Sequence, residues 1–266
     1  ELIKKGLKPG EDSASAVFEH PQWVEEIHRS YVEAGSNVIL ANTFGANAFK
    51  LKNSPYTVEE SINKAVNIAK KAAEGTDVLV ALDVSTTGEL LYPAGGLTFE
   101  DAYEAYKEVA ICGEKAGVDL VCLETFTDLK EARIALLAVK ENTALPAFVT
   151  LSFDENGTTM NGSTPSAVAV TLKAAGASAV GLNCSLGPDK IKGIVDEFLN
   201  YSDLPVIVKP NAGLPDPRTG EYTMNAEDFA EYMKEFYENG VSVMGGCCGT
   251  SPEYIRLLKN TLETVE

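Results

Sequence analysis

The sequence contains no apolar run close to the ~18 residues that a membrane-spanning helix requires, which argues against a helical membrane protein. It is also poor in positive charge, because 22 Lys and Arg residues stand against 39 Asp and Glu residues, for a formal net charge of −17. A negative field of that kind repels phosphate backbones and anionic lipid surfaces. Nucleic acids and membranes are therefore not expected as partners.

Cysteine is scarce, and its five copies are an odd number that a disulfide framework could not pair completely. No secretory signal peptide is recognisable, and the chain opens at Glu1 rather than Met, which leaves room for residues upstream. Low-complexity tracts and runs of like charge are absent as well. We therefore expect reduced thiols and a cytoplasmic location.

Short segments rich in β-branched residues alternate with segments of helical periodicity along the chain. A capping box of Thr57 and Glu60 marks the start of one helix, and Ser251 with Pro252 marks the start of the last. The predicted strands are 37–44, 77–85, 119–126, 146–154, 178–185, 205–213 and 241–250.

This alternation predicts an α/β fold in which helices cover a parallel sheet. A helix at 21–35 precedes the first visible strand, so we infer a further strand upstream of Glu1. Eight strands make a TIM (β/α)8 barrel, here with its first strand apparently missing upstream of residue 1. No Gly-rich GxGxxG turn follows any strand, which counts against an open dinucleotide-binding sheet. Residues 1–266 are expected to form one domain, a fragment or module of a longer protein.

Three cysteines are predicted at the ends of strands, where barrel active sites are built. Cys184 ends the segment 178–185, while Cys247 and Cys248 end the segment 241–250. Adjacent strand residues point to opposite faces, but the glycines of "GGCCGT" (245–250) allow a turn that brings both thiolates to one ion. Zinc suits such a set of sulfur ligands. The alternative is that these are small buried apolar side chains, which is the expected role of Cys112 and Cys122.

Three thiolates leave one tetrahedral position open, which is typical of catalytic rather than structural zinc. Asn211 lies at the end of the segment 205–213, and its side-chain oxygen could close the resting site and yield to substrate. The alternative for Asn211 is a loop-capping role. Glu124 is a carboxylate in an otherwise apolar strand end, either with a task at the site or as a salt-bridged structural acid. Asn183 and Thr43 are further candidates for substrate contacts or for strand-end hydrogen bonds.

Several motifs together resemble the homocysteine S-methyltransferase family, and most closely the homocysteine-binding module of cobalamin-dependent methionine synthase. They are "AGSNVILANTFGAN" (34–47), "TTGELLYP" (86–93), "LETF" (123–126), "GLNCSLGP" (181–188), "KPNAGLPD" (209–216) and "GGCCGTSPE" (245–253). The resemblance implies that the three cysteines hold Zn²⁺, that the homocysteine thiol enters as the fourth ligand, and that Glu124 takes the homocysteine ammonium group. The family's Asp-Gly-rich first-strand motif would precede Glu1.

The resemblance implies methyl transfer to homocysteine, which gives methionine, in one of several versions. Methylcobalamin bound to another module or to a separate corrinoid protein is the favoured donor, while S-methylmethionine and betaine are the alternatives. No cobalamin-binding or folate-binding module fits into 266 residues. Two other readings stay open: a non-catalytic barrel whose structural zinc takes His20 or Cys122 as a fourth ligand, and a thiol-redox protein with a disulfide between Cys247 and Cys248.

Overall fold

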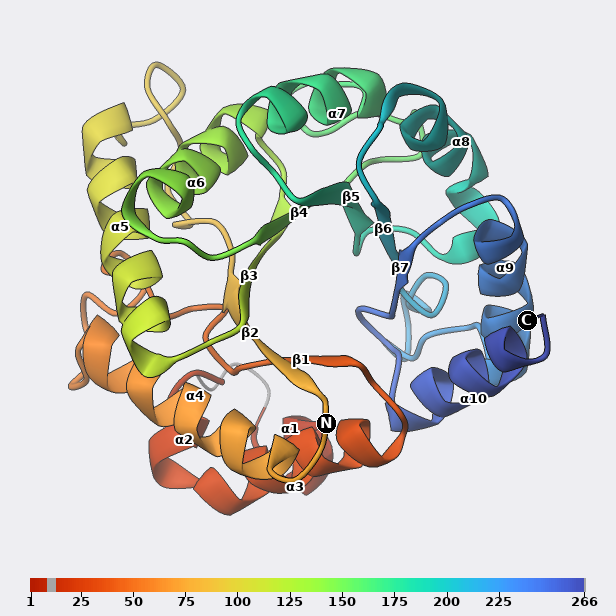
Figure 1. Ribbon diagram of the computed structural model, residues 1–266, viewed down its shortest axis with the longest axis horizontal. Coiled ribbons are helices and arrows are strands. Elements are labelled where there is room, and N and C mark those ends of the chain that lie inside the picture. The colour runs from red at the N-terminus through yellow and green to blue at the C-terminus, as the bar shows by residue number, and fades with distance from the viewer. Residues whose placement is uncertain (9–12, 266) are drawn as a thin grey trace. The chain divides into compact units, whose positions relative to one another are not determined.

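A computed structural model of the chain describes residues 1–8 and 13–265 (Figure 1). These residues form two compact units. Unit 1 comprises Glu1–Leu123 and Ile134–Ala147, and unit 2 comprises Glu124–Arg133 and Phe148–Glu266. The expectation of one domain over residues 1–266 stays a prediction.

Unit 1 contains the first strand–helix repeats of the chain. Its elements are α1 (Leu2–Lys5), α2 (Ala16–Glu19), α3 (Pro21–Glu33), β1 (Val38–Leu40), α4 (Val58–Ala73), β2 (Leu79–Val84), α5 (Phe99–Ala116), the first part of β3 (Leu120–Phe126) and most of α6 (Leu129–Asn142). The strands β1, β2 and β3 are parallel neighbours in chain order, with Val38 opposite Leu79 and Ala81 opposite Leu120.

Unit 2 continues the same alternation. Its elements are the last residues of β3, the start of α6, β4 (Ala147–Leu151), α7 (Pro165–Ala174), β5 (Ala179–Asn183), η1 (Pro188–Lys190), α8 (Lys192–Tyr201), β6 (Val206–Lys209), α9 (Ala226–Glu238), β7 (Val243–Met244) and α10 (Pro252–Glu263). Its strands also pair in parallel and in chain order, from β4 to β7. Helices α7 and α8 pack against β5, and α8 also packs against β6 (Figure 1).

The predicted α/β class is therefore confirmed, and the described residues contain the seven parallel strands expected from the sequence. Seven such strands, each followed by a helix, are what a (β/α)8 barrel contains when its first strand is not included. Strands β4, β5 and β6 are almost continuously buried, as expected for a parallel sheet covered by helices, whereas the short β7 is half-buried.

The helix starts follow from local hydrogen bonding. Thr57 Oγ1 accepts the backbone N–H of Glu60 at 3.2 Å, and the Glu60 carboxylate accepts the backbone N–H of Thr57 at 2.9 Å. The predicted capping box of α4 is thus confirmed. At α10, Ser251 and Pro252 hold the predicted positions, but the Ser251 side chain makes no capping hydrogen bond. None of the described helices is both long enough and apolar enough to cross a membrane.

Several strands end earlier than the sequence predicted. The predicted segment 241–250 contains only the two-residue β7, and the segment 178–185 contains β5, which stops at Asn183. The chain leaves the ladder where polar and glycine residues replace the apolar run. All three cysteines of interest therefore lie just beyond strands rather than within them.

Candidate metal and substrate site

Three cysteine side chains of unit 2 converge at the ends of β5 and β7. The Sγ atoms of Cys184, Cys247 and Cys248 all lie within 4.8 Å of one another. The distance from Cys184 Sγ to Cys248 Sγ is 3.8 Å, and all five cysteines of the chain have free thiols. The structure thus brings together the three residues that the sequence analysis singled out.

The spacing of the sulfur atoms suits a tetrahedral metal ion. Two sulfur ligands at about 2.3 Å from tetrahedral zinc lie about 3.8 Å from each other. Among the described residues, no further His, Cys, Asp or Glu belongs to this cluster. The donor set therefore fits zinc with one position left for another ligand.

A tight turn explains how Cys247 and Cys248, which are adjacent in the chain, can both contribute ligands. The backbone N–H and the Oγ1 hydroxyl of Thr250 both donate to the carbonyl of Cys247, at 3.2 and 2.8 Å. Within this turn Gly249 has φ +81°, a conformation that favours glycine. A Cβ atom at Gly249 would also lie 2.2 Å from the ring of Tyr222. Because the residues form a turn rather than a strand, Cys247 and Cys248 both reach the cluster.

The two preceding glycines have a different role from the one expected. Neither Gly245 nor Gly246 has a positive φ, so their backbone conformation is open to other residues. A Cβ atom at Gly246 would lie 2.5 Å from Thr250 Oγ1, and one at Gly245 would lie 3.3 Å from Lys209 Cγ. These glycines therefore allow close packing of neighbouring side chains rather than an unusual turn.

Three residues at the site adopt left-handed backbone conformations without being glycine. Thr125 and Cys184 have φ 62°, and Ser185 has φ 58°. Such conformations are unfavourable, particularly for a β-branched residue, and persist where surrounding contacts hold them. The backbone N–H of Cys184 donates to the carbonyl of Lys209 at 3.1 Å, which ties the end of β5 to the end of β6.

Hydrogen bonds among the three thiols shift their pKa values. Hydrogen bonds from Cys184 and Cys247 hold the pKa of Cys248 well below its usual range. The same contacts, to Cys184 first and then Cys248, together with burial, raise the pKa of Cys247. Burial and the neighbouring Cys248 thiolate raise the pKa of Tyr222 to about 12. One thiolate therefore forms readily, whereas further negative charge in the cluster requires a cation.

Asn211 lies beside the cluster, as the sequence predicted. Its side-chain oxygen accepts the backbone N–H of Cys248 at 3.0 Å, and its own backbone N–H donates to the carbonyl of Leu186 at 2.9 Å. Asn211 thus supports the cysteine turn. An amide oxygen has two lone pairs, so this hydrogen bond leaves one of them for a cation.

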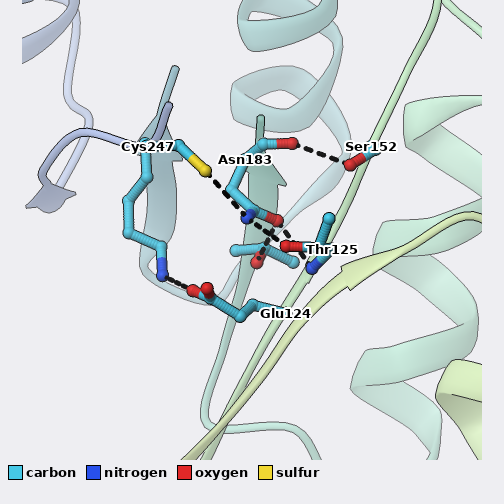
Figure 2. A network of polar contacts seen from close by, with 7 residues as sticks. Glu124, Thr125, Ser152, Asn183 and Cys247 are labelled. Carbon is cyan, nitrogen blue, oxygen red and sulfur yellow. Dashed lines mark hydrogen bonds and ion pairs between the residues drawn. The ribbon is translucent and has the colours of Figure 1, made fainter. Parts of the chain in front are cut away.

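Asn183, the last residue of β5, organises a buried network beside Cys247 (Figure 2). Its side-chain oxygen accepts hydrogen bonds from the backbone N–H of Thr125 and from Thr150 Oγ1, both at 2.8 Å. Its Nδ2 donates to Thr125 Oγ1 at 2.8 Å and lies 3.9 Å from Cys247 Sγ. Ser152 Oγ donates to the Asn183 carbonyl at 3.0 Å. The network links the strand end that carries Glu124 to the sulfur cluster.

Glu124 is buried near the end of β3 and forms an ion pair with Lys209 (Figure 2). The sequence analysis named Glu124 but missed Lys209. A signal was present, because Lys209 closes the buried apolar strand "VIVK" and stands directly before the "PNAG" motif.

The other candidates from the sequence lie in unit 1. Thr43 Oγ1 donates to the carbonyl of Asp83 at 2.8 Å and accepts its backbone N–H at 3.0 Å. These bonds join neighbouring strand ends, and a substrate contact for Thr43 stays a prediction. Cys112 and Cys122 are buried, in keeping with the apolar role expected of them.

The homocysteine S-methyltransferase family model matches residues 2–262. The chain belongs to the homocysteine S-methyltransferase family. The family predicted from the sequence is thus confirmed. A methionine synthase of Mycobacterium leprae (strain TN) is 31% identical over 252 residues, which are 89% of this chain and 21% of that protein. This member of the family therefore spans about a fifth of the length of that curated relative.

Solved structures support the fold. The metallated form of the homocysteine methyltransferase MmuM from Escherichia coli matches with a TM-score of 0.82 at 22% identity, covering 98% of this chain and 92% of that one. The oxidized form of the same protein matches with a TM-score of 0.82 at 20% identity, covering 97% and 91%. At these identities the likeness establishes the fold that this family member shares with MmuM.

Proposed function

We propose that this chain transfers a methyl group to the thiol of homocysteine, giving methionine, and that Cys184, Cys247 and Cys248 hold a zinc ion for this reaction. The observation that carries the proposal is the sulfur cluster, with 3.8 Å between Cys184 Sγ and Cys248 Sγ, in a chain of this family. The spacing matches two corners of a tetrahedral zinc site.

Methyl transfer to homocysteine needs the homocysteine thiol in its thiolate form at neutral pH. A free thiol has a pKa of about 8.5, and zinc coordination would remove its proton. The chain's own residues supply position: the cysteine turn and the left-handed Cys184 present their sulfur atoms to one point. Placing the reacting sulfur against the methyl donor supplies much of the remaining acceleration.

The neighbouring polar groups have proposed roles in binding the substrate. Glu124 takes the homocysteine ammonium group, and Asn183 positions Glu124 through the backbone of Thr125. Asn211 completes the resting zinc site and yields to the incoming thiol, while Thr43 is a further substrate contact. The catalytic set within this proposal is the three cysteines.

The methyl donor is proposed to be methylcobalamin, bound on another module or on a separate corrinoid protein. The similarity to a methionine synthase about five times as long favours this donor. S-methylmethionine and betaine are the alternatives. We also propose a cytoplasmic location, where the thiols stay reduced.

Metal analysis and binding tests separate this function from a structural zinc site. Purified protein should contain about one zinc ion per chain, and homocysteine should change the zinc X-ray absorption spectrum on saturation. Cys248→Ser should weaken zinc binding at least about 100-fold, whereas the matched control Cys112→Ser should not. Offering methylcobalamin, S-methylmethionine and betaine in parallel then identifies the donor. A coordination shell unchanged by homocysteine would overturn the proposal.

A further inference from the structure

Tyr222, a residue that the sequence analysis did not single out, packs against the cysteine turn. It lies in the loop between β6 and α9, where Pro215 and Tyr222 form an antiparallel bridge. A Cβ atom at Gly249 would lie 2.2 Å from Tyr222 Cγ and 2.6 Å from Tyr222 Cβ, so the tyrosine side chain occupies the space beside Gly249. Gly249 directly follows Cys248, which places Tyr222 next to a sulfur ligand of the proposed zinc site.

Hydrogen bonds fix the base of this loop to the same turn. The backbone N–H of Ala212 donates to the carbonyl of Cys248 at 2.9 Å, and the backbone N–H of Met224 donates to the carbonyl of Ala212 at 3.1 Å. The hydroxyl of Tyr254 donates to the Met224 carbonyl at 2.7 Å. The two ends of the loop are therefore attached to each other, and one of them is attached to the cysteine turn.

The hydroxyl group of Tyr222 interacts with the sulfur atom of Cys248. After the hydrogen bonds from Cys184 and Cys247, a hydrogen bond from this hydroxyl also lowers the pKa of Cys248. A thiolate has no proton to donate, so the tyrosine is the donor in this contact. Cys248 is an exposed residue, whereas Cys184 and Cys247 are half-buried. The hydroxyl is thus directed at the cysteine of the cluster that solvent and reagents reach most easily.

A second donor from outside the cluster lies beside Cys247 (Figure 2). The side-chain oxygen of Asn183 accepts hydrogen bonds from Thr125 N–H and Thr150 Oγ1, both at 2.8 Å. These bonds fix the orientation of the amide and leave its Nδ2 facing Cys247 Sγ at 3.9 Å. Both adjacent cysteines therefore have an uncharged hydrogen-bond donor on another segment of the chain.

Such donors matter because the proposed reaction has to distinguish between sulfur atoms. Methyl transfer forms one S–CH3 bond while the bond from the methyl carbon to its donor breaks, and the leaving group keeps the electron pair. A protein thiolate that attacked in place of homocysteine would become a neutral thioether. A hydrogen bond to a thiolate engages one of its lone pairs, and a thiolate of lower basicity is a weaker nucleophile.

We propose that Tyr222 is a positioning residue whose hydroxyl restrains the nucleophilicity of Cys248, so that the methyl group goes to the substrate sulfur rather than to the protein. Asn183 has the corresponding role at Cys247. This inference rests on the proposed function. Because both donors are directed at protein sulfur atoms, the substrate thiolate is left as the stronger nucleophile.

Methylation of the zinc-loaded protein by methyl iodide, without homocysteine, tests the inference. Attack by a sulfur atom forms an S–CH3 bond and releases iodide, and peptide mass analysis gives the rate at each cysteine. Tyr222→Phe keeps the ring against Gly249 but removes the donor, so Cys248 should react about tenfold faster. The rate at Cys247 should stay within about twofold of the wild-type rate, because Asn183 remains in place.

Tyr254→Phe is the matched control, because its hydroxyl supports the same loop through the Met224 carbonyl rather than through a sulfur atom. This variant should leave both methylation rates within about twofold of the wild-type values. Zinc content, measured for every variant, should stay at the wild-type level.

Cobalt(II) in place of zinc gives a second readout that a loss of packing would not move. Removing a hydrogen bond raises the energy of the sulfur lone pairs, so the sulfur-to-cobalt charge-transfer band should move to longer wavelength in Tyr222→Phe. Tyr254→Phe should show the wild-type spectrum.

Other results would overturn the assignment of Tyr222. If Tyr222→Phe held zinc but left the rate at Cys248 unchanged, the hydroxyl would not control this sulfur atom. If it accelerated Cys247 and Cys248 equally, lost zinc, or was matched by Tyr254→Phe, the tyrosine would only support the packing of the turn. A wild-type protein that binds neither zinc nor cobalt would instead refute the proposed function, and the inference with it.

Discussion

The side-chain oxygen of Asn183 lies 2.8 Å from the backbone nitrogen of Thr125 and 2.8 Å from Thr150 Oγ1. One buried amide thus accepts hydrogen bonds from two other strand segments and also donates to Thr125 Oγ1. Asn183 is only 1% exposed, so water cannot replace these partners. The left-handed conformation of Thr125 depends on this amide.

Asn183→Ala should destabilise the fold by about 3 kcal/mol, because it leaves the Thr125 N–H and the Thr150 hydroxyl without their acceptor in the interior. Thr150→Val is the matched control, since it removes a single hydrogen bond at nearly constant volume and should cost about 1 kcal/mol. Urea unfolding of the metal-free proteins measures both changes. An effect at Asn183 no larger than that at Thr150 would show that the network does not act as a unit.

Gly249→Ala should disrupt the cysteine turn. The position has φ +81°, and the added methyl group would meet the Tyr222 ring, so we expect a loss of about 2 kcal/mol in stability. Zinc affinity should fall about tenfold or more as Cys248 moves away. Gly193→Ala is the control: it lies in α8 with no neighbouring atom within 4 Å and should stabilise the protein by about 0.5 kcal/mol. Competition with a chromophoric chelator reports the affinity.

Cys248 should be the most acidic thiol of the metal-free protein. Because hydrogen bonds from Cys184 and Cys247 lower its pKa, Cys248 is a thiolate in acid solution, whereas Cys247, with a raised pKa, stays protonated. Iodoacetamide should therefore modify Cys248 at both about pH 5.5 and about pH 8, with little change in rate. Peptide mass analysis identifies the modified residue. A rate at Cys248 that rises about tenfold per pH unit would contradict the assignment.

His28 should make folding sensitive to acid. It is 7% exposed, its Nε2 has no hydrogen-bond partner among the described residues, and burial lowers its pKa from 6.5 to about 4. The unfolded chain therefore binds the proton first, and stability that is complete above pH 6.5 is lost as the pH falls toward 4.

Replacing His28 with leucine removes this proton-binding site. Between about pH 7.5 and about pH 4.5 the wild type should lose about 2.5 kcal/mol more stability than His28→Leu. Urea unfolding at the two pH values gives the difference, and the carboxylates common to both proteins cancel in the comparison. Parallel pH profiles would mean that the folded chain accepts the proton on His28 without penalty.

Local patterns predicted the repeating architecture well. The apolar periods located seven strands, and the Thr57 capping box located the start of α4, because both signals depend on residues close together in the chain. The cysteine cluster was also predictable. Parallel strands place their carboxyl ends at the same edge, so the cysteines at the ends of β5 and β7 could be brought together from topology alone.

The same local patterns could not predict which side chains pair between distant strands. Lys209 and Glu124 are 85 residues apart, and no periodicity links them. The early end of β7 was missed because the predicted segment 241–250 ran on through "GGCCGT", whereas the strand stops at Met244 and the cysteines lie in a turn. The role of Gly245 depends on the Lys209 stem that packs beside it, which only three-dimensional contacts reveal.

The left-handed backbone at Thr125, Cys184 and Ser185 bears on how this protein could be engineered. Glycine would relieve the local backbone strain at all three positions. At residue 184 the same change would delete a sulfur atom of the cluster, and at residue 125 it would delete a hydroxyl bonded to Asn183. Ser185 is the one of the three where this change removes neither group, so at the other two positions a relaxed backbone and the chemistry of the site exclude each other.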